Sequence, residues 1–168
     1  MHAFQPVNPE DIEEGAYSFV GHKIIITCKN GEKTNAVSAP WGGVGYVWNK
    51  RVTFIFVRAS RYTRECIDNS GEYSISFVDQ EAYRGALKYL GMVSGRDEDK
   101  IAGSRLTVNS YEGIPFIDEA YEVIPCKVLY EQLFDESCFI DKNIIRDLHL
   151  DGEQYIMYVG EVQTILLK

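Results

Sequence analysis

Three short segments of the chain combine residue types that could hold a phosphate group and a flat ring. Residues 34–43 are mostly small, which lets a ligand approach the backbone, and Trp41 in this segment could cover a ring. Residues 58–63 carry two guanidinium groups and the two aliphatic hydroxyls of Ser60 and Thr63, and they lead into a helix that we expect to begin at Thr63. A phosphate at that helix start would meet charge-assisted hydrogen bonds and free backbone N–H groups together. Residues 94–100, from Ser94 to Lys100, form the third segment.

Two of these segments, residues 34–43 and 94–100, also have a plainer structural interpretation. Residues 34–43 would then be a glycine-rich connection that ends near a core tryptophan. Residues 94–100 would be a solvated turn in which Asp97 caps a short helix.

The distribution of charge favours a small anionic ligand. The chain has 17 Lys and Arg residues against 25 Asp and Glu, a net charge of −8, which disfavours nucleic acid and anionic membranes as partners. Yet the window from Lys33 to Arg64 holds six basic residues and no acidic one, which leaves 11 basic against 25 acidic residues elsewhere. The alternative is that these six side chains lie on solvated strand ends and helix faces.

Strand-like segments dominate the 168 residues, and no linker or repeat divides them, so we expect a single domain over residues 1–168. Asn30-Gly31 predicts a tight hairpin turn after the first strand. The expected strands span residues 19–28, 52–57 (buried on both faces), 73–78 (half-buried), 121–134 and 155–167. The expected helices span 63–70 with Thr63 as N-cap, 79–90 with Asp79 as N-cap and Gly91 at its end, and 141–148. This order predicts a mainly β fold, a barrel or sandwich with peripheral helices.

Several other functional classes lack their motifs. The chain has four cysteines but no C-x-x-C, its three histidines form no metal-ligand pattern, and no P-loop or G-x-S-x-G sequence is present. Gly43-Val44-Gly45 begins like a dinucleotide fingerprint, but Trp48 takes the place of its last glycine and a strand follows. Cys66 lies on a predicted helix between arginines, which could lower its pKa, but we expect it to be a buried, inert thiol. With no apolar leader at the N-terminus, we expect a cytoplasmic protein.

The same segments, in order, resemble a known family. Asn35-Ala36 with Trp41-Gly42-Gly43, then the segments 46–50, 57–63, 94–100 and 157–162, are similar to the flavin reductase-like, flavoredoxin-type proteins. The resemblance covers nearly the whole chain. It implies an FMN-binding split β-barrel that forms homodimers, with the flavin sites near the subunit interface.

The resemblance also implies a role for particular side chains. The residues expected to line the isoalloxazine are Asn35, Ala36, Val37 and Ser38, with Trp41 beside the ring. Those expected to hold the ribityl chain and the phosphate are Arg58, Ser60, Arg61 and Thr63, with Ser94 and Lys100 completing the anion site. Two positions depart from the family pattern. Pro40 replaces a serine before the tryptophan, and Tyr155-Ile156 replaces a histidine–arginine pair.

The function implied by the resemblance is an NAD(P)H-dependent flavin oxidoreductase. The nicotinamide would pass hydride to FMN, and the reduced flavin would pass electrons to an acceptor such as a redox partner protein, so that no acid–base residue pair is required. A second hypothesis is a non-enzymatic electron carrier of the flavoredoxin type. A third is a phosphate-ligand binding module without a redox role.

Overall fold

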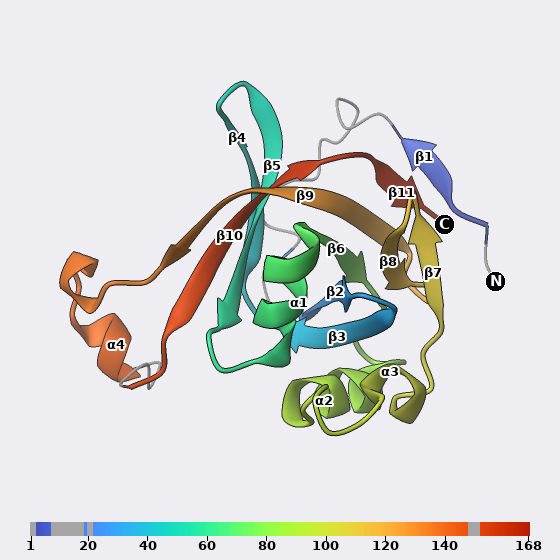
Figure 1. Ribbon diagram of the computed structural model, residues 1–168, viewed down its shortest axis with the longest axis horizontal. Helices are drawn as coiled ribbons and strands as arrows, with labels where there is room; N and C mark the ends of the chain where they lie inside the picture. The colour runs from blue at the N-terminus through green and yellow to red at the C-terminus, as the bar shows by residue number, and fades with distance from the viewer. Residues whose placement is uncertain (1–2, 8–18, 20–21, 148–151) are drawn as a thin grey trace.

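One curled antiparallel sheet with short helices packed against it makes up most of the molecule (Figure 1). The computed structural model describes residues 3–7, 19, 22–147 and 152–168. The expectations for His2, Val20, Gly21, Leu148 and His149 lie outside these residues. The strands are β1 (Gln5–Val7), β2 (Ile24–Asn30), β3 (Lys33–Ala39), β4 (Gly42–Val47), β5 (Lys50–Arg58), β6 (Glu72–Phe77), β7 (Val108–Tyr111), β8 (Ile114–Ile117), β9 (Glu122–Leu133), β10 (Tyr155–Val162) and β11 (Ile165–Leu167). The helices are α1 (Tyr62–Ser70), α2 (Arg84–Met92), α3 (Lys100–Gly103), the 3-10 turn η2 (Glu136–Cys138) and α4 (Asn143–Asp147).

The sheet runs in the order β3-β2-β6-β9-β10-β5-β4, which leaves β3 and β4 at its two ends. The predicted hairpin is confirmed, because Asn30 pairs with Lys33 and Gly31 turns the chain with φ of +58°. The long strand β9 pairs with β6, β10 and β11, so it joins the two halves of the sheet. The prediction of a mainly β fold with peripheral helices is confirmed.

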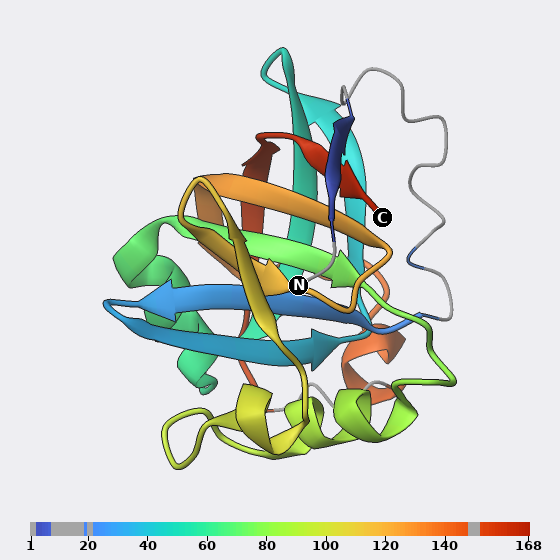
Figure 2. The same ribbon diagram turned by 90° about the vertical axis from the view of Figure 1, so that its right-hand side faces the viewer.

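Two hydrophobic clusters hold the sheet and the helices together. Alternate residues of β2 face opposite sides of the sheet. Ile26 lies in the cluster inside the curled sheet, and Ile25 lies in the cluster between the sheet and helices α2 and α3. Figure 2 shows α2 and α3 beneath β2 and β3. Ala36 belongs to this second cluster together with Leu87 and Leu90 of α2. The helices are therefore fixed against the strand that carries the first predicted site segment.

The structure corrects several expectations about the strands. Residues 34–39 are part of β3, not a loop, because they pair with β2 along its whole length. β6 is buried on both faces, since its serine face is covered by β8: Ser74 donates to the Pro115 carbonyl at 2.6 Å and Ser76 accepts from the Ile117 N–H at 3.2 Å. β5 departs from the expected burial on both faces, because Phe54 and Phe56 are only half-buried. Residues 155–167 form two strands, β10 and β11.

The helix ends also differ from the prediction. Arg61 and not Thr63 is the N-cap of α1, because the Thr63 side chain turns inward. Asp79 accepts from the Glu81 and Ala82 N–H groups in a turn that precedes α2, which begins only at Arg84. Gly91 lies inside α2 and does not end it. The helix predicted over 141–148 is present as α4 over 143–147.

The third site segment is capped two residues later than expected. Asp99, and not Asp97, caps α3 by accepting hydrogen bonds from the Ile101 and Ala102 N–H groups at 3.1 Å each. Asp99 stands directly before the first helical residue, which is where a carboxylate can reach these N–H groups. Lys100 therefore begins a helix, which holds its side chain against α2.

None of the helices described is long and apolar enough to span a membrane.

Candidate functional site

The fold brings the three predicted segments together around the start of α1. Asn35 on β3 donates its side-chain N–H to the Thr63 hydroxyl at 3.0 Å, and both residues are buried. Lys33 donates to the Gly95 carbonyl at 2.5 Å, and Arg96 donates to the Ser60 carbonyl at 3.0 Å. At Gly95 a Cβ atom would clash with the Asn35 side chain, so a glycine is required for this close approach.

A pocket of about 380 Å³ opens where β3, β5, α2 and the start of β10 meet, and we call it the inner pocket. Its basic residues are Lys23, Arg58, Arg61 and Lys88, and no carboxylate is among the described residues that line it. The remaining lining residues are Val37, Ser38, Ala39, Pro40, Trp41, Phe56, Val57, Leu87, Gly91, Met92 and Tyr155. A pocket of this size and charge suits a flat, anionic ligand.

Carbonyl groups in the C-terminal half of α2 accept hydrogen bonds from several of the predicted site residues. Ser38 donates to the Leu87 carbonyl at 2.6 Å, Arg61 to the Gly91 carbonyl at 2.6 Å, and Lys100 to the Leu90 carbonyl at 2.8 Å. These carbonyls lie at the negative end of the helix dipole, where cations are stabilised. The arrangement fixes two cationic side chains beside the inner pocket.

Lys100 is only 4% exposed, and its charge is costly there. Burial, together with the neighbouring Arg61 guanidinium, lowers the pKa of Lys100 to about 8. A bound anion would restore the charged form of the ammonium group. The pair of Arg61 and Lys100 is therefore electrostatically suited to a phosphate.

The first turn of α1 offers further donors. Arg61 is the N-cap residue, and its side chain makes no capping hydrogen bond. The N-terminal end of an α-helix carries N–H groups without intrahelical partners and a partial positive charge. This turn can therefore bind an anion next to Arg61.

Arg58 and Ser60 lie on the other side of the site. Arg58 donates through Nε to the Tyr155 hydroxyl at 2.8 Å, and its Nη1 lies 3.7 Å from Glu153 Oε2. Ser60 donates to Glu153 Oε1 at 2.9 Å. Trp41 completes this wall, with its ring centroid 5.3 Å from that of Tyr155.

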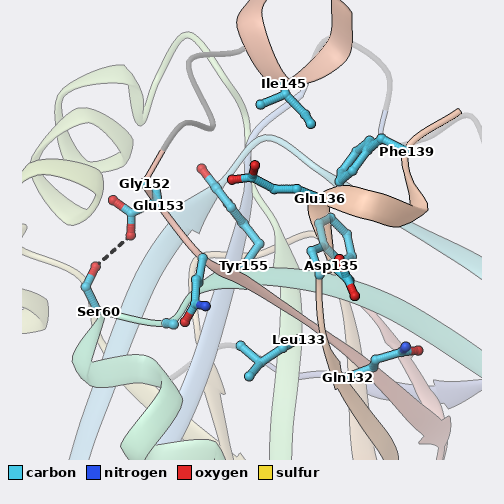
Figure 3. Close-up of a pocket in the computed structure, with 13 residues that line it drawn as sticks. Ser60, Gln132, Leu133, Asp135, Glu136, Phe139, Ile145, Gly152, Glu153 and Tyr155 are labelled. Carbon is cyan, nitrogen blue, oxygen red and sulfur yellow. Dashed lines mark hydrogen bonds between the residues drawn. The ribbon is translucent and has the colours of Figure 1, made fainter. Parts of the chain in front are cut away.

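A second, larger pocket of about 880 Å³ lies beyond Tyr155, and we call it the outer pocket (Figure 3). It is formed by the ends of β5 and β9, the start of β10 and the connection between β9 and β10. Its lining residues are Ala59, Ser60, Gln132, Leu133, Phe134, Asp135, Glu136, Phe139, Ile145, Gly152, Glu153, Gln154 and Tyr155. Tyr155 lines both pockets.

Not all predicted site residues reach a pocket. Val37, Ser38, Trp41, Arg58 and Arg61 line the inner pocket. The side chain of Ala36 lies in the hydrophobic cluster beneath α2. Ser94 accepts a hydrogen bond from the Arg96 N–H at 3.2 Å. Asn35 and Thr63 are hydrogen-bonded to each other at the start of α1, and Lys100 is hydrogen-bonded to the end of α2. Ser60 lines the outer pocket.

The basic window divides in the folded chain. Lys33, Arg58 and Arg61 gather around the site, but Lys50 pairs with Glu161 at 2.7 Å and Arg64 with Asp68 at 3.3 Å, away from it. The window is therefore only in part a ligand site, because alternate strand residues and successive helix residues face different directions.

Sequence reasoning missed some of the lining residues. Lys23 and Lys88 supply half of the basic residues of the inner pocket but lie outside the basic window. Glu153 forms an ion pair with Arg58 and accepts a hydrogen bond from Ser60, but it lies far from both in the sequence. Tyr155 was visible only as a departure from the family pattern. No local signal identifies these residues, because the contacts form between segments that are distant in the chain.

Buried thiols lie behind the site. Cys28 contacts the carbonyls of Asn35 and Thr63 at 3.9 and 3.8 Å, and burial raises the pKa of its thiol. A hydrogen bond from Cys28 lowers the pKa of Cys66. Cys66 is fully buried, as expected.

Comparisons with known proteins agree with this geometry. The family model described as flavin reductase like domain matches residues 17–167. No curated protein matches the sequence. The fold is similar to an FMN-binding domain of a flavin reductases-like enzyme from Shewanella baltica OS155, with a TM-score of 0.72, 17% identity, and coverage of 98% of this chain and 77% of that one.

Two other solved structures show the same fold. The flavoredoxin of Desulfovibrio vulgaris (Miyazaki F) has a TM-score of 0.68 and 21% identity, with 96% of this chain and 76% of that chain covered. Nitrilotriacetate monooxygenase component B from Bacillus cereus has a TM-score of 0.67 and 17% identity, with 98% and 82% covered. The chain is thus a mainly β protein with a basic pocket at the edge of its sheet. Since the family model spans most of its length, this chain belongs to the flavin reductase-like family.

Proposed function

We propose that the chain binds FMN, with the isoalloxazine in the inner pocket and the phosphate near Arg61, Lys100 and the first turn of α1. The observation that carries this proposal is a pair of cations, the half-buried Arg61 and the buried Lys100, beside a helix start that no side chain caps. Inside a protein such a pair is costly unless an anion compensates it. A phosphorylated flavin supplies both the anion and a flat ring of the right kind for the small residues of β3 and for Trp41.

The protein's own contribution is binding and orientation. Ser38 and Arg61 are held by carbonyls of α2, and Asn35 is fixed by Thr63, so the wall of the site is preorganised. Trp41 and Tyr155 present aromatic surface on one side of the inner pocket. The bound flavin would supply the redox chemistry, accepting hydride and passing electrons on.

We further propose that NAD(P)H is the electron donor, which makes the chain an NAD(P)H-dependent flavin oxidoreductase. The second candidate is an electron carrier without this activity, which the likeness to flavoredoxins favours. Mixing the FMN-loaded protein with NADH or NADPH under anaerobic conditions separates the two. The reductase hypothesis predicts bleaching of the flavin absorbance at a rate useful for turnover. Flavin that stays oxidised with either nucleotide, yet is reduced by light, would identify a carrier.

The proposal includes a homodimer. Large apolar side chains are exposed on the β4–β5 hairpin and on β9, where Trp48 is 56% exposed and its ring lies 5.9 Å from that of Tyr130. Figure 1 shows that this hairpin and the β9–β10 connection both project from the body of the sheet, and Ile140 in the connection is 97% exposed. These exposed apolar side chains support the proposal of an interface between subunits. A cytoplasmic location stays a prediction.

A further inference from the structure

The inner and outer pockets share a wall but have opposite charge. Tyr155 lines both pockets, and Arg58 is hydrogen-bonded to its hydroxyl. Among the described residues, the lining of the inner pocket has four basic side chains and no acidic one. The described lining of the outer pocket has three carboxylates, Asp135, Glu136 and Glu153, and no Lys, Arg or His. The two pockets therefore select ligands of opposite charge.

The carboxylates of the outer pocket differ in the groups that surround them. Glu153 is partly compensated by Arg58 and Ser60. Asp135 accepts from the Ser137 N–H at 2.8 Å, and hydrogen bonding to Ser137 lowers its pKa, so it stays ionised. The lysine of this segment, Lys142, donates to the main-chain carbonyls of Glu136 and Ser137.

Three aromatic residues of the outer pocket lie next to one another. Phe134 packs edge-to-face against Phe139 with ring centroids 5.8 Å apart, and lies 6.5 Å from the Tyr155 ring. In Figure 3 the Glu136 side chain extends across the pocket toward the side where Tyr155 and Glu153 lie. Aromatic surface with carboxylates at its rim binds flat cations through stacking, cation–π contact and charge.

We propose that the outer pocket binds the electron acceptor of the reduced flavin, and that this acceptor is a flat organic cation, such as a positively charged heteroaromatic ring. This inference rests on the proposed FMN site in the inner pocket. The transfer balances as one hydride equivalent: two electrons and a proton leave the reduced flavin and enter the cationic ring. The flavin returns to its oxidised form, and the product is a neutral reduced ring.

The test compares two tricyclic dyes of similar shape and opposite charge, the cation methylene blue and the anion resorufin. Their binding to the FMN-loaded protein is measured by equilibrium dialysis at low salt. The variants are Asp135→Asn, Glu136→Gln and the double variant, with Glu32→Gln as a matched control that removes one carboxylate on the exposed β2–β3 turn. We expect methylene blue to bind the parent more tightly than resorufin does, and the double variant to bind it about tenfold or more weakly. Glu32→Gln should bind it like the parent.

Reoxidation of the photoreduced flavin gives a second measurement. Methylene blue should reoxidise it faster in the parent than in the double variant, while bound FMN stays equal in both. Unchanged methylene blue binding in the double variant, or equal binding of both dyes to the parent, would overturn the inference while leaving the flavin site intact. A chain that takes up no FMN would instead overturn the proposed function, and with it the inference that depends on it.

Discussion

Arg61 is the side chain whose role in the site can be tested most selectively. It belongs to the inner pocket and donates to the Gly91 carbonyl, whereas Arg64, one turn further along α1, lines neither pocket and pairs with Asp68. We predict that Arg61→Ala weakens FMN binding by about tenfold or more, since a charge-assisted hydrogen bond contributes roughly 1.5–3 kcal/mol. Riboflavin lacks the phosphate and should lose less affinity. Arg64→Ala is the control for the loss of one positive charge, and an equal effect of both variants would contradict the assignment.

Lys100 gives the site a dependence on pH. Its pKa is lowered from an ordinary 10.5 to about 8, so between these values the unfolded chain binds more protons than the folded one, and stability rises with pH across this window. A bound phosphate favours the charged ammonium. FMN binding therefore takes up a proton above pH 8, and we predict that its affinity falls there by up to about tenfold per pH unit.

Fluorescence titration with FMN from pH 7 to about 9.5 measures this dependence. The Lys100→Arg variant keeps the positive charge at every pH in that range, so its FMN affinity should stay level. The same fall in the parent and in Lys100→Arg would show that another group titrates.

Strand β3 carries small residues for two different reasons. Val37 and Ser38 line the inner pocket, but Ala36 is fully buried against Leu87 and Leu90. We predict that Ala36→Leu destabilises the fold by about 1–3 kcal/mol, because it overpacks a closed cluster, and that any loss of flavin follows from this strain. Ala102→Leu, on the exposed face of α3, is the control and should stay within about 0.5 kcal/mol of the parent. Denaturant unfolding measures both, and a parent-like Ala36→Leu would place this residue outside the core.

The elements show what the sequence could and could not predict. The Asn30-Gly31 hairpin and the existence of strands β5 and β9 follow from turn chemistry and β-branched runs, which act locally. The face of β6 that carries Ser74 and Ser76 could not be recognised as buried from the sequence. It is covered by β8, a strand that lies about 40 residues further along the chain. Glu153 was missed for the same reason, since only the folded sheet places it beside Arg58.

The whole molecule is expected to be a dimer. Tyr46 and Trp48 on the β4–β5 hairpin, with Tyr130 and Leu133 on β9, are large apolar residues that a single chain leaves exposed. Light scattering of the FMN-loaded protein at micromolar concentration should give twice the mass of 19.1 kDa. Trp48→Asp should shift the mass toward that of one chain without unfolding it. A parent that is a monomer under these conditions would contradict the prediction.

The central claim is that the curled sheet and α2 together form a site for one FMN per chain, and a direct binding measurement tests it. The protein freed of flavin is titrated with FMN, and the bound fraction is followed by the change in flavin absorbance and fluorescence. The account predicts saturation at one FMN per chain, with a dissociation constant in the micromolar range or below and tighter binding than riboflavin. A chain that remains colourless after incubation with excess FMN and removal of the free flavin would contradict it.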